Sequence, residues 1–462
     1  MKIHFIAIGG SAMHGLAIEL HKKGYEVTGS DDEIYEPARA NLARCNLLPA
    51  ETGWFPDKIH PGLNAVILGM HARADNPELK QAQNLKIPVF SYPEFIYEQS
   101  KNKKRVVVAG SHGKTTITGI ILHVLRNNGI DFDYMSGAAI PGFDSNIRLT
   151  DKAPLIVLEG DEYLSSPIDR QPKFLHYKSH IALISGIAWD HINVFPDPDI
   201  YTDQFRKFVR QIPDRGTLIF CVDDPLLKEI TKNSPPGVRK ILYGIHPHKL
   251  ENGTTFLLPG KSENRDGISP ENVKLSIFGD HNLYNISGAM AVCRELGLQD
   301  DQFYRAVGSF SGAKNRLQLL AQANSSLIFR DFAHAPSKVT ATLSAVKKQF
   351  PLHTIIACLE LHTFSSLNVS FLSQYRHSLD DADQAFVYFN PHAVELKKLR
   401  PLDPEKIREG FGRNNLEVIS DSADLKKKIA SLSRSGTVLL MMTSGDFDGM
   451  DMEKLAREFV RQ

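Results

Sequence analysis

Short runs of apolar residues alternate with amphipathic segments over the first hundred residues. The run Lys2–Ile8 predicts a buried strand, and a glycine-rich turn separates it from a helix predicted over Met13–Lys23. Further apolar runs predict strands at Tyr25–Gly29, Asn64–Leu68 and Pro88–Phe90. Alternating strands and helices are typical of βαβ units, so this part of the chain is predicted to form a parallel sheet.

A second strand–loop–helix unit follows the polar stretch Lys101–Arg105, which we interpret as a linker. Val106–Ala109 predicts the strand, Gly110–Lys114 the loop and Thr115–Asn127 the helix. The loop-rich stretch Pro247–Pro270 predicts a hairpin inserted in this segment, and a helix after Asn282 is expected to close it. The other apolar runs predict further strands at Leu155–Leu158, Ile181–Ser185 and Thr217–Cys221.

A third α/β pattern begins near Arg316. Its apolar runs predict strands at Leu327–Asp331, Thr354–Leu359, Ala385–Tyr388 and Thr437–Met442. A chain of 462 residues is too long for one ordinary hydrophobic core. The three successive patterns therefore predict several α/β domains.

Composition and residue patterning argue against several classes of partner and several cellular locations. The formal net charge of +1 gives no electrostatic reason to expect nucleic acid or an anionic membrane as a partner. No apolar run reaches the roughly 18 to 20 residues of a membrane-spanning helix. The apolar start, Met1–Met13, has no small-residue cleavage site and predicts a buried strand and not a signal peptide. The four cysteines are far apart, as expected of a reduced cytoplasmic chain.

The strongest local signal is the loop Gly110-Ser-His-Gly-Lys-Thr-Thr116 between a predicted strand and a predicted helix. Its glycines let backbone N–H groups approach phosphate oxygens, and the helix N-terminus favours an anion. Lys114 is placed to bind the β- and γ-phosphates, and the Thr115 hydroxyl to bind Mg²⁺. The general phosphate-loop pattern has another glycine where Val108 stands. The alternative is a glycine-rich turn with a solvated lysine.

A glycine turn near the amino terminus predicts a second nucleotide site. Gly9-Gly10-Ser11-Ala12-Met13 lies where dinucleotide-binding folds place a diphosphate, although a plain tight turn is the alternative. Asp31 ends the second predicted strand, the place of a ribose-binding acid, so a nicotinamide-dependent dehydrogenase must be considered. The phosphate loop a hundred residues later would have no role in such an enzyme. Two phosphate-binding turns favour two different nucleotides.

Polar clusters follow several predicted strands. Glu159-Gly-Asp-Glu162 suits Mg²⁺, with a solvated loop as the alternative. Asp190-His191 follows another strand, and a lone histidine there is usually structural. Gly279-Asp-His-Asn-Leu-Tyr-Asn285 opens a helix, and the alternative is that Asp280 or Asn282 is simply its cap. Arg330-Asp-Phe-Ala-His-Ala-Pro336 ends a strand of the third segment, where ligands gather in open α/β sheets.

In order and spacing these motifs resemble those of the Mur ligases, the cytoplasmic enzymes of peptidoglycan precursor synthesis. The resemblance covers essentially the whole chain. It rests on the Gly9-Gly10 turn, Asp75-Asn-Pro-Glu78, Gly110–Thr116, Glu159–Glu162, Asp190-His191, Gly279–Asn285, Arg316 and Asp331-Phe-Ala-His334. It implies an ATP-dependent enzyme that joins a carboxylate on a UDP-sugar to an amine through an acyl phosphate.

The resemblance also implies an α/β fold of three domains. A Rossmann-like domain over residues 1–103 would bind the UDP-sugar. A central P-loop ATPase with a mostly parallel sheet would span residues 104–314. A carboxy-terminal Rossmann-like domain over residues 315–462 would contact ATP and the amine.

Within the family, the muramate-binding branch fits best. One type adds L-alanine to UDP-N-acetylmuramate, and the recycling type adds L-alanyl-γ-D-glutamyl-meso-diaminopimelate. The stretches that resemble the recycling type are Tyr35-Glu-Pro37, Lys173-Phe-Leu-His-Tyr177, Asp190-His-Ile-Asn-Val-Phe195 and Gly308-Ser-Phe310. We therefore expect the tripeptide as acceptor, with the L-alanine ligase as the alternative.

Five stretches depart from the family pattern. Glu159-Gly-Asp-Glu162 replaces the family's Glu-Ala-Asp-Glu, and Asn315-Arg316 replaces its paired arginines. Arg330-Asp-Phe-Ala-His-Ala-Pro336 replaces its Asp-Asp-(Tyr/Phe)-Ala-His-His-Pro. Glu360-Leu-His-Thr-Phe-Ser365 stands for the recycling type's Glu-Pro-Arg-Ser-Asn-Thr, so His362 replaces an arginine. Thr443-Ser-Gly-Asp-Phe-Asp-Gly449 stands for Ser-Asn-Gly-Gly-Phe-Gly-Gly. The last two lie where the family binds the amine, so the identity of the amine is the open question.

Carried over residue by residue, the resemblance implies a role for each of the following positions. Lys114, Glu159 and His191 would be catalytic, and Thr115, Glu159 and His191 would hold Mg²⁺. ATP would contact Gly110, Ser111, His112, Gly113, Lys114, Thr115, Thr116, Asn282, Arg316, Asp331 and His334. The UDP-sugar would contact Gly9, Gly10, Ser11, Ala12, Met13, Asp31 and His71. The amine would contact His362 and Ser444.

ATP and Mg²⁺ are thus the expected cofactors, and UDP-N-acetylmuramate with a peptide or amino acid the expected partners. No nucleic acid, membrane or obligate protein partner is expected. Related ligases with a carbamoylated lysine place it where Arg206 stands, so no such lysine is predicted. A non-enzymatic alternative is a ligase-like protein that senses UDP-muramoyl compounds without turnover. This alternative stays open because both stretches where the family binds the amine depart from the family pattern.

Overall fold

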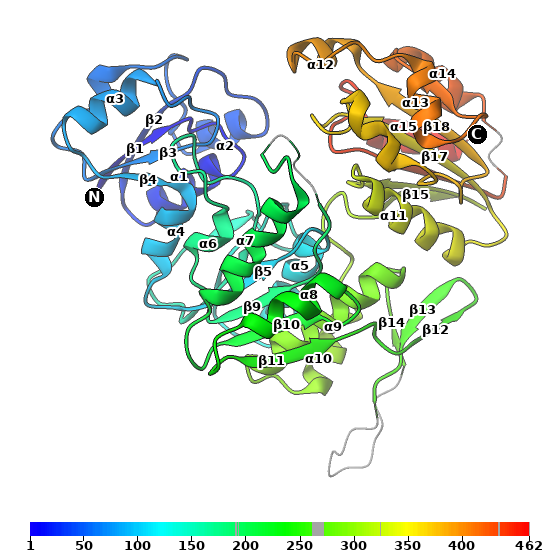
Figure 1. Cartoon of the computed structure of the whole chain (residues 1–462), viewed down its shortest axis with the longest axis horizontal. Helices are drawn as coiled ribbons and strands as arrows, with labels where there is room; N and C mark the ends of the chain where they lie inside the picture. Colours follow the sequence, from blue (N-terminus) through cyan, green and yellow to red (C-terminus); the bar gives the residue numbers. More distant parts are fainter. Residues whose placement is uncertain (190–191, 193, 261–271, 324, 433–434, 462) are drawn as a thin grey trace. The chain divides into compact units, whose positions relative to one another are not determined.

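The computed structural model describes residues 1–189, 192, 194–260, 272–323, 325–432 and 435–461 (Figure 1). The chain divides into two compact units. The first comprises Met1–Trp189, Asp197–Gly244 and Gly288–Phe303; the second comprises Asp190–Pro196, Ile245–Ser287 and Tyr304–Gln462.

The first unit begins with a four-stranded parallel sheet in the order β2-β1-β3-β4. Its strands are β1 (Lys2–Ile6), β2 (Glu26–Ser30), β3 (Ala65–Leu68) and β4 (Val89–Ser91). The helices between and after them are α1 (Met13–Lys22), α2 (Ala38–Arg44), α3 (Pro77–Asn84) and α4 (Tyr92–Ser100), with a 3₁₀ turn η1 at Pro56–Lys58. Strand residues such as Ile6, Val66 and Leu68 pack with Leu79 of α3 in one buried cluster.

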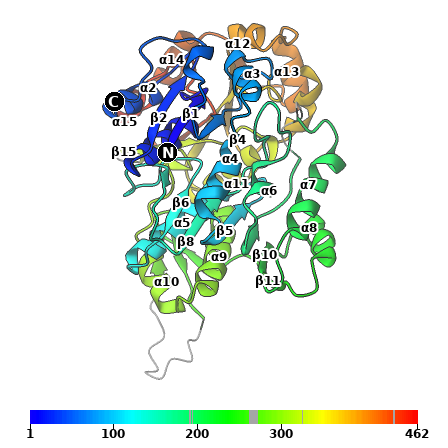
Figure 2. The same ribbon diagram turned by 90° about the vertical axis from the view of Figure 1, so that its left-hand side faces the viewer.

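A seven-stranded sheet in the order β11-β10-β9-β5-β8-β6-β7 completes the first unit, and only β7 is antiparallel to its neighbour. Its strands are β5 (Lys104–Ala109), β6 (Asp133–Met135), β7 (Ile147–Arg148), β8 (Leu155–Glu159), β9 (Ile181–Ile184), β10 (Thr217–Cys221) and β11 (Arg239–Tyr243). The helices are α5 (Lys114–Asn127), α6 (Lys173–His176), α7 (Pro198–Arg210) and α8 (Pro225–Ile230), followed by the 3₁₀ turn η2 (Thr231–Asn233). Figure 2 shows α7 and α8 side by side.

The second unit holds two sheets. The smaller is antiparallel: β12 (His248–Glu251), β13 (Thr254–Leu257) and β14 (Val273–Lys274). The larger has the order β15-β16-β20-β17-β18-β19, with only β15 antiparallel: β15 (Gln318–Ala323), β16 (Ser326–Asp331), β17 (Thr354–Leu361), β18 (Gln384–Phe389), β19 (Glu417–Ile419) and β20 (Thr437–Met442).

Helices cover both faces of the larger sheet. They are α11 (Pro336–Gln349), η3 (Val369–Tyr375), α12 (Pro391–Leu396), α13 (Pro404–Phe411), α14 (Ser422–Ala430) and α15 (Met452–Arg461), while α9 (Asp280–Glu295) and α10 (Asp300–Val307) each contribute to both units. Alternate residues of each strand enter two separate cores. Phe329 packs with Leu343 of α11 on one face, and Ile328 packs with Leu455 of α15 on the other.

The predicted α/β fold with mostly parallel sheets is confirmed, and the predicted strands lie within a few residues of the observed ones. Strand β1 is shorter than predicted because Ala7 takes a left-handed φ of 67°. The connection between α4 and β5 is shorter than the predicted linker Lys101–Arg105: β5 begins at Lys104, and the buried ammonium of Lys103 lies 2.6 Å from Asp133.

The predicted hairpin is present as β12 and β13 and forms part of the second compact unit. The Gln349 side chain of α11 explains this grouping. Its Nε2 donates to the Gly253 carbonyl at 2.6 Å, and its Oε1 accepts from the Thr255 hydroxyl at 3.2 Å.

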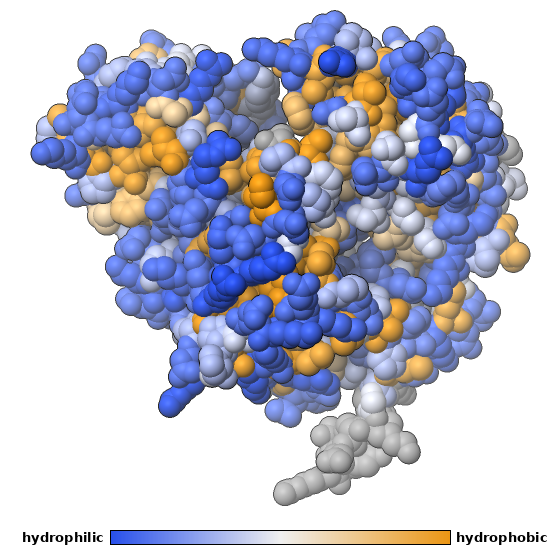
Figure 3. Space-filling model, in the orientation of Figure 1, coloured by the Kyte–Doolittle hydropathy of each residue, from blue (hydrophilic) through white to orange (hydrophobic). Residues whose placement is uncertain are grey.

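The visible face of the space-filling view is largely hydrophilic, with smaller hydrophobic groups between the polar ones (Figure 3). In the described part of the chain, no helix has both the length and the apolar character that crossing a membrane requires.

Candidate functional site

The phosphate loop connects β5 to α5 as predicted. Gly110 has a φ of 120° and Gly113 a φ of 74°, both in the region that favours glycine. A Cβ on Gly110 would come within 2.8 Å of the Ser185 backbone nitrogen, so a larger residue does not fit. Gly113 is the N-cap residue of α5, and no side chain caps the helix there. The first N–H groups of α5 therefore face the loop, the arrangement that favours a bound phosphate.

Lys114 and the acidic stretch after β8 come together at this loop. The Lys114 ammonium donates to the Gly110 carbonyl at 2.7 Å and to Glu162 Oε2 at 2.6 Å. Burial alone would lower the pKa of Lys114, but the charges of Glu162, Asp161 and Glu159 outweigh it and raise that pKa. The ammonium is therefore held charged in a buried position, as a phosphate-binding lysine requires.

Glu159 and Thr115 form the second contact of the loop. Glu159 ends β8 and is buried, and its Oε1 accepts from the Thr115 hydroxyl at 2.8 Å. Its Oε2 accepts from the Gly137 backbone N–H at 2.7 Å. A carboxylate and a hydroxyl held together beside a phosphate loop are hard oxygen donors of the kind Mg²⁺ prefers.

The predicted third ligand, His191, and its neighbour Asp190 lie outside the described residues. The strands that precede Glu159 and His191 are not neighbours in the sheet. Strands β8 and β9 both pair with β5 and lie on either side of it.

In the amino-terminal sheet, the glycine turn is held by Asp31. The Gly9 backbone N–H donates to Asp31 Oδ2 at 2.7 Å, and a Cβ on Gly9 would lie 2.9 Å from that oxygen. Burial raises the pKa of Asp31 to about 6, although the hydrogen bond from Gly9 opposes this. Asp31 thus orients the turn, a role that differs from the open ribose-binding acid of a dehydrogenase.

The other predicted UDP-sugar residues share the carboxyl edge of this sheet. Ala12 is the N-cap residue of α1 and supplies no side-chain hydrogen bond, Ser11 is exposed, and Gly10 begins the turn into the helix. His71 is exposed and follows β3, the strand beside β1. Ligands of open parallel sheets bind at this edge.

In the second unit, Asp331 is fully engaged by its own surroundings. Its Oδ2 accepts from Leu317 N–H at 2.6 Å, and its Oδ1 accepts from Ala333 N–H at 2.8 Å and the Thr342 hydroxyl at 3.1 Å. The Arg316 guanidinium lies 4.4 Å from the centre of the Phe332 ring. These contacts fix the loop that carries the predicted ATP contacts.

The remaining predicted ATP contacts also have partners nearby. His334 Nδ1 lies 2.9 Å from the Phe332 carbonyl. The buried Asn282 amide donates to the Phe278 carbonyl at 2.8 Å and accepts from Asn285 at 3.3 Å, so its place at the start of α9 is fixed by local contacts.

Predicted amine residues His362 and Ser444 come together at the carboxyl ends of β17 and β20. The buried Glu360 carboxylate accepts from the Thr443 hydroxyl and, at 3.0 Å, from Phe447 N–H. His362 Nδ1 lies 3.6 Å from Glu360 Oε1. Burial would raise the pKa of Glu360, but the nearby His362 and the hydrogen bonds from Thr443 and Phe447 outweigh it and lower that pKa.

Comparisons with known proteins address the whole chain. Three sequence models of one family match successive stretches: "Mur ligase family, catalytic domain" over residues 2–104, "Mur ligase middle domain" over 108–293 and "Mur ligase, glutamate ligase domain" over 315–445. The chain belongs to the Mur ligase family. It is accordingly an ATP-dependent amide ligase, and the three-domain α/β fold of the family is the fold observed.

Proteins similar to this Mur ligase include L-alanine ligases and a murein peptide ligase. The UDP-N-acetylmuramate–L-alanine ligase of Rhodopseudomonas palustris is 29% identical over 96% of this chain and 95% of the relative. The crystal structure of the murein peptide ligase Mpl from Psychrobacter arcticus matches with a TM-score of 0.69, 24% identity and coverage of 100% and 99%. The UDP-N-acetylmuramate–alanine ligase from Thermotoga maritima matches with a TM-score of 0.72, 20% identity and coverage of 100% and 98%.

Sequence reasoning missed Tyr201 of this Mur ligase, which supports the phosphate loop. The Tyr201 hydroxyl lies 2.7 Å from the Ser111 hydroxyl and 3.4 Å from Glu162 Oε1. It projects from α7, which the sequence analysis did not predict. Asp197 followed by Pro198, with aromatic residues at helical spacing after them, was the available signal.

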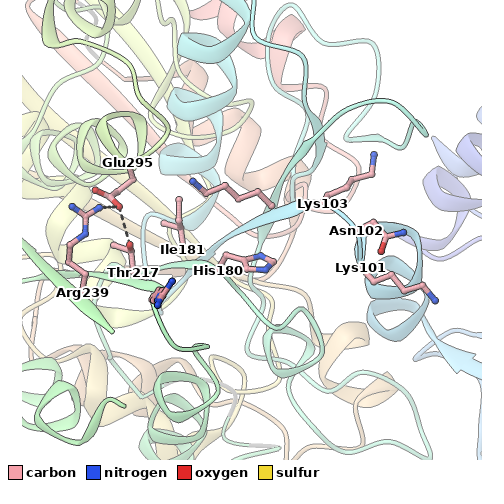
Figure 4. Close-up of a pocket in the computed structure, with 10 residues that line it drawn as sticks. Lys101, Asn102, Lys103, His180, Ile181, Thr217, Arg239 and Glu295 are labelled. Atoms are coloured by element: carbon pink, nitrogen blue, oxygen red, sulfur yellow. Dashed lines mark hydrogen bonds and ion pairs between the residues drawn. The ribbon is translucent and has the colours of Figure 1, made fainter. Parts of the chain in front are cut away.

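A pocket of about 640 Å³ lies at the opposite edge of the central sheet, where β5, β9, β10 and β11 begin (Figure 4). Figure 4 shows Thr217 and Arg239 turned toward Glu295, with His180 and Ile181 between them and Lys101. Several of its cations already have partners: Lys103 pairs with Asp133, Lys101 with Glu98 and Arg239 with Glu295. This pocket lacks the glycine loop and the uncapped helix start that mark the predicted ATP site.

One further group of possible metal ligands is present in the described chain: Glu94, Asp169 and His176. His176 Nε2 lies 2.7 Å from Asp169 Oδ2, and both side chains are partly buried. This contact is that of an ion pair between α6 and the loop before it. Mg²⁺, which prefers oxygen ligands, is better served by Glu159 and Thr115.

Proposed function

We propose that this Mur ligase joins the carboxylate of UDP-N-acetylmuramate to the amino group of L-alanine, either free or at the start of a short peptide. A carboxylate is a poor electrophile, and phosphorylation by ATP turns it into an acyl phosphate with a good leaving group. The amine attacks that carbonyl and phosphate departs. Most of the catalysis then lies in positioning and in charge neutralisation.

The observation that carries this proposal is the joined set of Lys114, Thr115 and Glu159 at the phosphate loop. Lys114 binds the β- and γ-phosphates in this proposal, exchanging its contact with Glu162 for phosphate oxygens. Thr115 and Glu159 hold Mg²⁺, with His191 as a further ligand; when bound, the ion neutralises charge on the phosphates. Asn282, Arg316, Asp331 and His334 belong to the ATP-contacting segments.

We propose that residues 1–103 bind the UDP-sugar, with the uncapped start of α1 and the Gly9–Met13 turn at the diphosphate. Asp31 positions Gly9 in this arrangement, and His71 lies at the same edge. Residues 104–314 bind ATP, and residues 315–462 bind the amine.

The acceptor is either the tripeptide expected from the sequence motifs or free L-alanine. The curated relatives carry the name of the L-alanine ligase and favour that alternative. Among the similar solved structures, one is a murein peptide ligase and another an L-alanine ligase. In both cases the carboxylate substrate is UDP-N-acetylmuramate and the attacking amine is the amino group of L-alanine or an L-alanyl residue.

Initial rates of phosphate release decide between them. The assay contains ATP, Mg²⁺ and UDP-N-acetylmuramate with L-alanine, L-alanyl-D-glutamate, or tripeptides ending in diaminopimelate or lysine. A tripeptide as the best acceptor supports the recycling reading, and L-alanine as far the best supports the alternative. If no acceptor releases phosphate, the proposal fails and the binding-protein rival takes its place. A titration with NAD tests the dehydrogenase alternative, because only a dehydrogenase is expected to bind NAD.

A further inference from the structure

Arg330 lies beside the amine-site residues at the carboxyl edge of the larger sheet in the second unit. Strand β16 carries Arg330 near its end and pairs with β20, and β20 pairs with β17. Arg330 lies two residues after Ile328, and Glu360 two residues after Cys358; both apolar residues belong to the core that faces α15. Because strand residues alternate between faces, Arg330 and Glu360 share a face.

Gly445 lies close to Arg330 and also to His362 and Glu360. Its carbonyl accepts from Arg330 Nη2 at 3.2 Å. A Cβ on Gly445 would lie 2.8 Å from His362 Nδ1 and 2.9 Å from Glu360 Oε2. The Gly445 backbone therefore contacts the Arg330 guanidinium through its carbonyl and lies close to the His362 ring, and a side chain at this position would clash with His362 and Glu360.

The donors here are only partly satisfied within the described chain. Arg330 Nε and Ser444 Oγ are buried and have no hydrogen-bond partner there. Asp446, Glu360 and Glu453 are the carboxylates whose charges act on Arg330, but no ion pair joins any of them to it among the described residues. Glu360 is engaged by Thr443 and Phe447. Buried donors without partners are uncommon, and these two could take a ligand's oxygens as partners.

We propose that Arg330, with Ser444, binds a carboxylate of the acceptor beside His362. Arg330 thereby supplies the cation that the recycling type places at the position of His362. A guanidinium presents a planar fork that matches a carboxylate, which a histidine does not. This inference rests on the proposed function, since it assigns the acceptor's carboxylate to that function's amine site. The carboxylate is the α-carboxylate of L-alanine or the terminal carboxylate of a peptide.

The test compares each acceptor with its amide. Steady-state rates are measured for L-alanine against L-alaninamide, and for the tripeptide against its C-terminal amide, in the wild type and in Arg330→Gln. We expect the KM of the carboxylate form to rise about tenfold or more in the variant, because charge-assisted hydrogen bonds are lost, while the KM of the amide stays within about twofold. Arg330→Lys should restore part of the preference. Arg457→Gln, at an exposed arginine of α15, serves as the control and should change neither KM.

A role confined to fastening the Gly445 loop would raise the KM of acid and amide alike, and that result overturns the inference. The acceptor whose preference for acid over amide is lost in Arg330→Gln is the one that supplies the carboxylate. Thermal shift of the wild type and Arg330→Gln with L-alanine, the tripeptide and their amides gives a readout without turnover. Failure of the wild type to turn over any acceptor counts against the proposed function. Equal thermal shifts by acid and amide in the wild type count against Arg330.

Discussion

The Lys114 ammonium lies 2.6 Å from the buried Glu162 carboxylate while it also donates to the Gly110 carbonyl. The lysine of the phosphate loop is therefore oriented by an acid from the stretch after β8 and by the loop's own backbone. Glu162 in turn lies 3.4 Å from the Tyr201 hydroxyl. The cation is thus held at the loop and does not extend into solvent, which suits its proposed role at the γ-phosphate.

Replacing Lys114 by alanine should abolish ATP-dependent turnover. The substitution removes the charge that the proposed mechanism directs at the γ-phosphate, and it leaves the Gly9 turn untouched. We expect phosphate release to fall by about a thousandfold or more, while binding of UDP-N-acetylmuramate by calorimetry stays near the wild-type value. Lys228→Ala, at an exposed lysine of α8, is the control. Turnover within tenfold of the wild type would show that the assignment of Lys114 is wrong.

The Glu159→Gln substitution should weaken Mg²⁺ dependence. Glutamine keeps the size of the side chain and an oxygen for the Thr115 hydroxyl, but it removes the negative charge that attracts the ion. The Mg²⁺ concentration for half-maximal rate is expected to rise about tenfold or more, with a lower maximal rate. Titration of the rate with Mg²⁺ at saturating ATP measures both. Asp199→Asn, at an exposed position of α7, should leave the curve unchanged; an unchanged curve for Glu159→Gln contradicts the magnesium site.

Asp31 should make stability depend on pH in the acidic range. Burial raises its pKa from 3.8 to about 6, so the folded chain holds a proton that the unfolded chain loses. The stabilisation is fully present below about pH 4 and is lost as pH rises through about 6. Asp31→Asn keeps an oxygen for the Gly9 N–H but cannot ionise.

The variant should therefore gain stability relative to the wild type between about pH 4 and about pH 7. Urea unfolding midpoints at several pH values measure this difference. The exposed Asp57, replaced by asparagine, is the control. Parallel pH curves for the wild type and Asp31→Asn would contradict the raised pKa.

The fold could be predicted largely because buried parallel strands are continuous apolar runs. The run Thr217–Cys221 became β10 with the same bounds, and Thr437–Met442 became β20. Short or polar strands gave no such signal: β11 (Arg239–Tyr243) carries two charged residues and was not predicted. The polar residues of Lys101–Arg105 predicted a longer linker than the structure has. Burial of Lys103 could not be predicted locally, because it depends on Asp133, thirty positions away in the sequence.

The site was less predictable than the fold. Motif spacing indicated Lys114, Thr115 and Glu159, and the structure joins them at one loop. Spacing could not give the order of strands, so the arrangement of β8 and β9 around β5 was unforeseen. Nor could it relate Arg330 to His362, since that relation depends on β20 lying between β16 and β17.

His362 is the position where substitution should change the choice of acceptor most directly. Its side chain is 42% exposed, and its Nδ1 lies 3.6 Å from Glu360. Diaminopimelate and lysine differ by one carboxylate on the side chain of the third peptide residue. A histidine offers at most two donors for that carboxylate, whereas an arginine offers a charged fork.

We therefore expect wild-type KM values for tripeptides ending in diaminopimelate and in lysine to lie within about tenfold of each other, since Arg330 remains available for the terminal carboxylate. In His362→Arg, the KM for the diaminopimelate tripeptide should fall about tenfold while that for the lysine tripeptide changes little. His362→Gln keeps a neutral donor and should not widen the difference. A strict wild-type preference for diaminopimelate would show that another residue discriminates the third position. Free L-alanine as far the best acceptor would remove the peptide reading, and the L-alanine ligase would take its place.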